Sequence, residues 1–353
     1  MMSFSMWLSN SQKSLYKWIA NTFGTTQPLL FTGATIGVGI ISGAAYLYTN
    51  PESLFYWTDR YMLSSAGFSV KYIQGNNCTF CYAEHGQLRS DKPSLLFIDR
   101  FSGRKESWMK VCKGLPSALH IICVELPGQG DTTLHEDQNM ASLYRLTDLL
   151  AEFASLLNLE VVPHHVVGWS MGGSVAALYA AKYPQFVRRL TLIAPLMQCP
   201  IETEFWSVKE DTEHLPFLTN DPEQLKVLAE KSFHNPDLAP KSLWVYKALI
   251  KRIQTKREFL KELYVNMKEE ITEESSKFDN LLSKIKCPVQ VIWGEQDQGS
   301  SRREPGSSRY LVTCVAAQRR LWRQQCCQEG SVLGRVDRNH EKQQHAGRPC
   351  TMC

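Results

Sequence analysis

Ser170 is the residue of this sequence whose neighbours best suit it to act as a nucleophile. It stands in the pentapeptide Gly168-Trp169-Ser170-Met171-Gly172, a G-x-S-x-G pattern. The apolar run before it predicts a strand, and residues 173–182 after it predict a helix. A serine on such a strand–turn–helix elbow exposes its Oγ at a helix N-terminus, where N–H groups and the helix dipole favour developing negative charge. The N–H of Met171 is then one donor to an oxyanion.

The elements that must position Ser170 are short buried strands that alternate with helices. Residues 69–83 alternate in a β-like manner, and five apolar runs follow at 95–98, 120–124, 165–168, 190–193 and 289–293. Helical patterns occupy 141–157 and 173–182. This alternation predicts an α/β fold with a mostly parallel central sheet and flanking helices. We place the core at residues 69–195, and its last strand with the turn after it at 286–298.

Residues 196–285 interrupt the alternation of strands and helices. The segment is polar, and it combines helical stretches such as 247–270 with Pro216, Pro222, Pro236 and Pro240. We interpret it as an inserted helical cap. Caps over sheets of this kind usually gate a pocket.

Charge and cysteine content exclude some classes of function. The net charge is +4, but residues 299–353 hold nine Arg and Lys342 against four acidic residues, so this tail carries +6 and residues 1–298 carry −2. Such a body is not a basic nucleic-acid binder. Cys78 and Cys81 form a C-x-x-C, but no second pair stands at a zinc-like spacing, which favours structural cysteines over a metal or redox pair. We expect no metal and no cofactor.

A single transmembrane anchor is predicted at residues 29–48, after an N-terminal segment of residues 1–28. No charged residue occurs between Lys17 and Glu52, and a helix of about 20 residues spans roughly the 30 Å of a bilayer core. A buried soluble helix is disfavoured because the stretch has no polar face. A cleaved signal peptide is disfavoured because the apolar run starts late and is long. Similar basic flanks leave the orientation open.

Four motifs stand in the order of a known family, at residues 94–103, 124–130, 167–173 and 291–298. Over about residues 50–298 the chain resembles the α/β-hydrolase family, and within it the membrane-anchored monoacylglycerol lipases. The resemblance implies transfer of an acyl group from a lipid ester, of the monoacylglycerol type, to water. Ser170 would attack, Asp297 would orient a histidine base, and the N–H of Phe101 would be the second oxyanion donor. A haloalkane or epoxide hydrolase is disfavoured because those enzymes use Asp at the elbow.

The sequence departs from this family in its oxyanion loop and in its tail. Asp99-Arg100 stands where the family usually has His-Gly, and Glu125 where it commonly has Asp. The family's Gly-His motif after the acid is missing, and the only later histidines are His340, a weak candidate base, and His345. The change of composition predicts that residues 299–353 are a disordered basic tail and that the C-terminal part of the fold is incomplete. A shifted reading frame, an alternative exon or a misjoined gene model would each explain it.

Two hypotheses of different class therefore remain. The first is a membrane-anchored serine hydrolase of lipid esters that forms an acyl-enzyme through Ser170. The second is a catalytically inactive homologue that acts as a binding protein, or a truncated or frameshifted product. Loss of one oxyanion donor costs about 10²–10³ in rate, and loss of the triad histidine about 10⁶.

Overall fold

The computed structural model describes residues 39–135, 140–197, 215–233, 235–294 and 310–315. The chain divides into two units, Met1–Trp57 and Thr58–Cys353. The described part of the first unit is a helix over residues 39–49 and the start of α3 (Glu52–Ser65). No helix among the described residues is both long and apolar enough to cross a membrane. Residues 29–38 of the predicted anchor lie outside the described residues.

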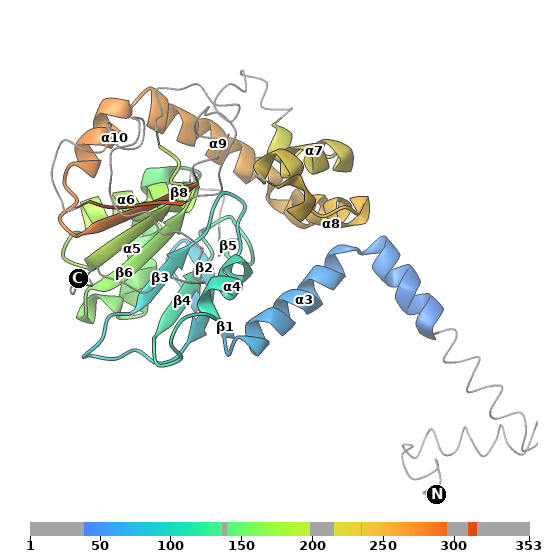
Figure 1. Ribbon diagram of the computed structural model, residues 1–353, viewed down its shortest axis with the longest axis horizontal. Helices are drawn as coiled ribbons and strands as arrows, with labels where there is room; N and C mark the ends of the chain where they lie inside the picture. Colours follow the sequence, from blue (N-terminus) through green and yellow to red (C-terminus); the bar gives the residue numbers. More distant parts are fainter. Residues whose placement is uncertain (1–38, 136–139, 198–214, 234, 295–309, 316–353) are drawn as a thin grey trace, which may run out of the picture. The chain divides into compact units, whose positions relative to one another are not determined.

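The second unit is built on a sheet whose central strands run parallel (Figure 1). The strand order is β1-β2-β4-β3-β6-β7-β8-β9, and β5 pairs with β2 beside this path. Neighbours from β4 to β8 pair in parallel, whereas β1, β2, β5 and β9 pair antiparallel. The α/β prediction is thus confirmed. The strands are β1 (Ser69–Gln74), β2 (Cys78–His85), β3 (Leu95–Ile98), β4 (Ile121–Val124), β5 (Thr133–Leu134), β6 (His164–Trp169), β7 (Val187–Ile193), β8 (Val289–Gly294) and β9 (Tyr310–Val315).

The two faces of the sheet bury different side chains. Leu96 and Ile98 of β3 belong to the large core that contains α5 (Leu143–Leu156) and α6 (Met171–Lys182). Phe97 points to the opposite face, since side chains alternate along a strand, and packs there with η2 (Lys105–Trp108) and α4 (Met109–Cys112). Helix α6 is almost completely buried and rich in Gly and Ala. Such small side chains allow the helix to lie close to the sheet.

Between β7 and β8 the elements that the structure describes are all helices. Residues 215–285 are called the helical insertion below. Helices α9 and α10 (orange) lie along one edge of the sheet, and α7 and α8 (olive) lie beside them (Figure 1). The prediction of helices here is confirmed, although the stretch 247–270 is two helices separated by a 3₁₀ turn. The elements are η5 (Pro216–Leu218), α7 (Pro222–Ser232), η6 (Pro236–Leu238), α8 (Leu243–Ile253), η7 (Gln254–Lys256), α9 (Arg257–Thr272) and α10 (Ser275–Leu282).

Helix α9 fixes one end of the helical insertion to the core. The Glu270 carboxylate accepts hydrogen bonds from the backbone N–H of Leu143, at 2.8 Å, and from the Ser142 hydroxyl. These donors lie at the N-terminus of α5, where a carboxylate is favourable. Asn266 donates to the carbonyl oxygen of Ala141 at 2.7 Å. The C-terminal half of α9 is therefore the root of the insertion.

The predicted disorder of residues 299–353 is wrong for one segment. Residues Tyr310–Val315 form β9, which pairs antiparallel with all six residues of β8, from Val289↔Val315 to Gly294↔Tyr310. The sequence there, YLVTCV, is rich in β-branched and aromatic residues, which favour strands. The pairing also satisfies backbone groups of β8 that an open sheet edge would leave unpaired. Residues 316–353 lie outside the described residues.

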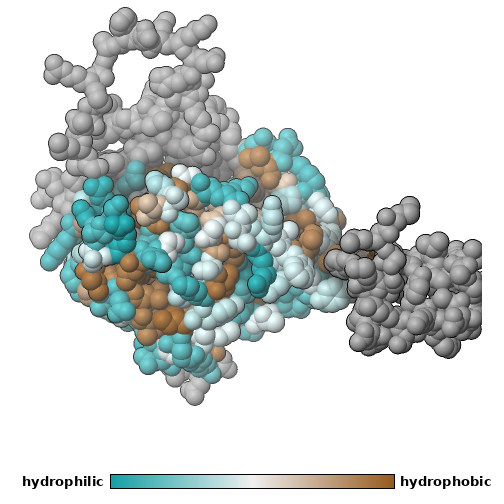
Figure 2. All heavy atoms as spheres, turned by 90° about the horizontal axis from the view of Figure 1, so that it is seen from below, coloured by the Kyte–Doolittle hydropathy of each residue, from teal (hydrophilic) through white to brown (hydrophobic). Residues whose placement is uncertain are grey.

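Folding does not bury every large apolar side chain. Seen from below, the described surface shows apolar groups (brown) gathered in patches among hydrophilic ones (teal) (Figure 2). Exposed apolar residues of the second unit include Tyr61, Tyr72, Val161, Val227 and Leu238. Surfaces with scattered apolar side chains are usual for folded proteins, so these residues alone assign no function.

Candidate active site

The elbow at Ser170 has a strained backbone. Ser170 joins β6 to α6 with φ 52° and ψ −121°, in a region that residues with a Cβ rarely adopt. Its N–H donates to the carbonyl oxygen of Ile193 at 2.9 Å, and its carbonyl oxygen accepts from Gly173 N at 2.8 Å and Leu196 N at 3.0 Å. These bonds hold the strained residue in place. The side chain is half-buried.

Two glycines make room for this turn. A Cβ on Gly168 would lie 2.4 Å from the carbonyl oxygen of Gly172, so β6 and the first turn of α6 approach too closely for any side chain. A Cβ on Gly172 would lie 2.3 Å from the carbonyl oxygen of Asp99. The elbow is therefore pressed against the loop that follows β3. This contact brings Met171, the first residue of α6, to the same edge of the sheet as Phe101.

Asp99 holds the loop that carries Phe101. Its buried carboxylate accepts hydrogen bonds from the backbone N–H groups of Arg100 and Arg104, both at 2.8 Å. Burial raises the pKa of Asp99, although Arg100 and the hydrogen bonds oppose this. Both oxygens of the carboxylate therefore accept hydrogen bonds from N–H groups of their own loop. The side chain of Asp99 thus fixes the conformation of this loop, and the contact is called the Asp99 clamp below.

Arg100 also has a defined place beside the elbow. Its guanidinium lies 4.4 Å from the centre of the Trp169 ring and 3.5 Å from the Asp99 carboxylate. Stacking of a guanidinium on an aromatic face is favourable. Arg100 therefore ties the oxyanion loop to the residue that immediately precedes the nucleophile.

Phe101 lies between the core and the helical insertion. Its ring packs edge-on against Phe217 of η5, with ring centres 5.3 Å apart. Phe217 in turn packs against Tyr264 of α9, with ring centres 5.0 Å apart. A set of packed aromatic rings, with Phe101 and Phe217 partly buried and Tyr264 buried, thus adjoins the predicted oxyanion loop. The other predicted site residues, Asp297, His340 and His345, lie outside the described residues.

The histidines that the structure describes are remote from Ser170. His164 and His165 lie at the start of β6, and the elbow follows the end of the same strand. The length of the strand separates them from Ser170 by roughly 17 Å. His135 hydrogen-bonds Gln74 and Thr79 beside β2, three strand spacings from β6. The remaining two described histidines, His85 and His120, lie near the edge of the sheet where the parallel strands begin. A base for Ser170 is therefore not found in the described part of the chain.

A hydrogen-bonded Ser–His–Glu set does occur at that opposite edge. Ser94 Oγ lies 2.7 Å from His120 Nδ1, and His120 Nε2 lies 3.0 Å from Glu84 Oε1. Ser94 precedes β3 and is only 2% exposed. A substrate cannot reach a serine so deeply buried, so these residues tie β2, β3 and β4 together and do not form a second catalytic site.

The fold, with a serine on the β6–α6 elbow, agrees with the comparison with known families. A family model described as alpha/beta hydrolase fold matches residues 93–314. The chain belongs to the α/β hydrolase fold family. It is thus a member of a family of enzymes, and the match includes β9, beyond the point where the sequence resemblance was expected to end.

Named relatives of this α/β hydrolase are lipases. The human protein "Monoacylglycerol lipase ABHD6" is 30% identical over 281 residues, which cover 76% of this chain and 80% of the relative. The crystal structure of lip1 from Acinetobacter baumannii AYE matches with a TM-score of 0.59 and 27% identity, over 69% of this chain and 80% of that one. A membrane phospholipase A, titled a bacterial virulence factor, matches with a TM-score of 0.58 and 25% identity, over 76% and 83% of the two chains.

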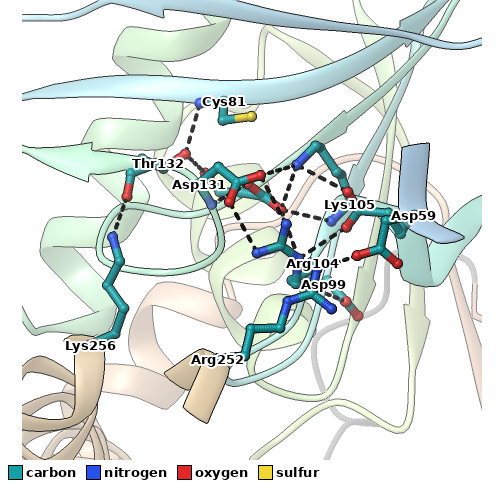
Figure 3. Close-up of polar contacts among 11 residues, drawn as sticks. Asp59, Cys81, Asp99, Arg104, Lys105, Asp131, Thr132, Arg252 and Lys256 are labelled. Carbon is teal, nitrogen blue, oxygen red and sulfur yellow. Dashed lines mark hydrogen bonds and ion pairs between the residues drawn. The ribbon is translucent and has the colours of Figure 1, made fainter. Parts of the chain in front are cut away.

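Next to the oxyanion loop lies a buried ion cluster that the sequence did not predict (Figure 3). Lys105 is 1% exposed, and its ammonium lies 3.0 Å from Glu125, 2.9 Å from Asp131 and 3.1 Å from Glu106. Arg104 pairs with Asp131 at 2.9 Å and with Glu106 at 3.2 Å. The sequence signal available was the run Arg104-Lys105-Glu106, which resembles an ordinary solvated surface.

The electrostatics of this cluster are those of a satisfied ion network. Burial favours neutral Lys105, but Glu125, Glu106 and Asp131 outweigh it and raise the Lys105 pKa. Burial likewise opposes ionisation of Asp131, yet Lys105 and Arg104 lower its pKa to about 2. Ligand atoms of Cys81, Glu125 and Asp131 lie within 4.8 Å of one another. Because the Lys105 ammonium already bonds both carboxylates, they do not require a metal.

Glu125 also shapes the turn that follows β4. Its carboxylate accepts from the backbone N–H of Asp131 at 2.6 Å. Gly130, with φ +53°, has no room for a side chain because a Cβ would lie 2.2 Å from that carboxylate. The Glu in place of the family's Asp thus has a structural role.

The cysteines of the C-x-x-C lie buried in β2. Burial raises the pKa of Cys78 and Cys81 to about 12, so both are inert thiols.

Proposed function

We propose that the protein is a serine hydrolase of lipid esters, of the monoacylglycerol lipase type. The observation that carries the proposal is the strained Ser170 on the elbow between β6 and α6, with the Phe101 loop pressed against it. The similarity to lipases, among them human monoacylglycerol lipase ABHD6, supports the choice of substrate. The partly buried rings of Phe101 and Phe217, backed by the buried Tyr264, offer apolar groups suited to an acyl chain.

The proposed reaction has two steps. Ser170 Oγ attacks the ester carbonyl carbon, its proton passes to a base, and the N–H groups of Phe101 and Met171 stabilise the oxyanion. The C–O bond to the glycerol oxygen then breaks, and that oxygen takes the proton from the base. Water attacks the acyl-enzyme in the same way and releases the fatty acid. We assign Asp297 as the acid that orients the base, and His340 as the histidine to test first.

Access to the substrate is proposed to be from a bilayer. Residues 29–48 would anchor the chain, with the lipid ester entering beneath the helical insertion, which acts as a cap. The uncharged stretch between Lys17 and Glu52 supports the anchor. Partition of the full chain into membranes that resists alkaline carbonate, compared with a variant lacking residues 29–48, tests this part.

Hydrolysis of a monoacylglycerol by the full chain in detergent tests the reaction. We expect fatty acid release that Ser170→Ala abolishes, a loss of about 10⁶ when a triad serine is removed. Ser94→Ala serves as the matched control, because Ser94 is also bonded to a histidine but lies at the other edge of the sheet. Asp297→Asn and His340→Asn test the proposed acid and base. No hydrolysis by the folded chain would instead support the inactive homologue.

A further inference from the structure

Two basic side chains of the helical insertion reach the buried ion cluster of the core (Figure 3). Arg252, at the end of α8, bonds the Asp59 carboxylate, which is only 7% exposed. Lys256 of η7 donates to the carbonyl oxygen of Thr132 at 2.9 Å. Both cations are thus used for contacts across the boundary between insertion and core.

The charges on the core side of this boundary do not balance by themselves. In their ionised forms Asp59, Glu106, Glu125 and Asp131 supply four negative charges. Arg104 and Lys105 supply two positive ones, and Asp99 beside them is paired with Arg100. Asp59 interacts electrostatically with Glu106 and Arg104, so it belongs to the same cluster. Among these residues the carboxyl groups outnumber the cations of the core by two, and Arg252 and Lys256 supply two positive charges.

Burial of Asp59 and Lys256 strengthens the charge interactions between the insertion and the core. Asp59 is buried and Lys256 is half-buried. This burial raises the pKa of Asp59 and lowers the pKa of Lys256. Charge pairs in such surroundings are screened much less by salt than exposed pairs. When the insertion moves away, the excess negative charge of the core becomes exposed to counterions.

Other residues of the insertion contact two loops of the core. Phe259 of α9 covers Gly128, where a Cβ would lie 2.1 Å from its ring. Phe217 contacts Phe101. The insertion is rooted separately, through Asn266 and Glu270. Contacts at Arg252 and Lys256 therefore hold the junction between α8 and α9, apart from that root.

From these contacts we infer that Arg252 and Lys256 are positioning residues, an electrostatic latch that holds the helical insertion closed on the core beside Ser170. The latch rests on the proposed function only in the claim that closure serves catalysis. Opening of the latch would separate two cations from a cluster in which carboxyl groups outnumber the other cations by two. Salt therefore favours the open form by screening the exposed core.

Hydrogen–deuterium exchange of the full chain in detergent tests the latch without any need for catalysis. In Arg252→Gln/Lys256→Gln we expect amide exchange in α7 and α8 to rise roughly tenfold or more, because losing a buried, hydrogen-bonded charge partner shifts an equilibrium by more than one power of ten. Exchange in β6 and α6 should not change. Lys241→Gln/Lys247→Gln, which removes the same charge from exposed lysines of the insertion, is the matched control.

Two further readouts separate a latch from general loosening of the fold. Raising the salt concentration should speed exchange of α7 and α8 in the wild type but not in the double variant, and Arg252→Lys should restore part of the protection. Equal exchange in the double variant and the lysine control would overturn the latch. An absence of esterase activity with the expected exchange pattern would overturn the proposed function and leave the latch standing.

Discussion

Gly128 is the residue at which the contact between the helical insertion and the core can be measured most directly. Its φ is +76°, and a Cβ built on it would lie 2.1 Å from the Phe259 ring. Replacement by Ala has two costs. A left-handed backbone costs a residue with a Cβ about 1–2 kcal/mol, and overpacking against a ring costs about 1–3 kcal/mol. We expect Gly128→Ala to lower the free energy of unfolding by about 2–5 kcal/mol.

A double-mutant cycle with Phe259→Ala separates the two costs. Removal of the ring leaves only the backbone cost of about 1–2 kcal/mol, so the two substitutions should couple by about 1–3 kcal/mol. Equilibrium urea unfolding of the full chain in detergent, followed by tryptophan fluorescence, gives the four free energies. If Gly128→Ala costs the same with and without the Phe259 ring, the ring does not lie on Gly128 and the reasoning is refuted.

Three further substitutions test the site and its support. Gly172→Ala would place a Cβ 2.3 Å from the backbone oxygen of Asp99. We expect it to lower the free energy of unfolding by about 1–3 kcal/mol, measured by thermal unfolding. An unchanged melting curve would contradict the close approach. Asp99→Ala leaves two backbone N–H groups without their acceptor, and should lower the free energy of unfolding in urea by about 1–3 kcal/mol. Asp99→Asn should recover part of this loss. Full stability of Asp99→Ala would show that the Asp99 clamp does not hold the loop. Burial lowers the pKa of His164 to about 4 from 6.5, so the unfolded chain binds a proton that the folded chain does not, and stability falls as the pH drops from 6.5 to 4. The contribution of His164 to this fall should reach about 3 kcal/mol, so the fall should be smaller by that amount in His164→Gln, where His165, whose pKa burial also lowers, still contributes. Parallel pH profiles for the two proteins would exclude His164 as a source of the fall.

The sequence predicted the strands and the elbow because their signals are local. Runs such as 95–98 and 121–124 are apolar throughout, as is typical of parallel strands buried on both faces. Ser170 was found because two glycines, a strand and a helix surround it in sequence. The structure places these elements within one or a few residues of the predicted bounds.

What the sequence did not predict depends on partners distant along the chain. Lys105 belongs to a polar run, and only the approach of Glu125 and Asp131 makes it a buried ion. The sequence showed Asp99 only as a departure from the family pattern, because its role as an acceptor depends on the turn back to Arg104. Residues 310–315 were assigned to a disordered tail on composition, although their own pattern favours the strand that β8 pairs with.

Reaction of the full chain in membranes with a fluorophosphonate probe tests the central claim most directly, because the probe labels only an activated serine. We predict a covalent adduct that mass spectrometry assigns to Ser170, and its loss in Ser170→Ala. An adduct that persists in Ser170→Ala, or no adduct on folded wild-type protein, would contradict the assignment of Ser170 as the nucleophile of a working hydrolase.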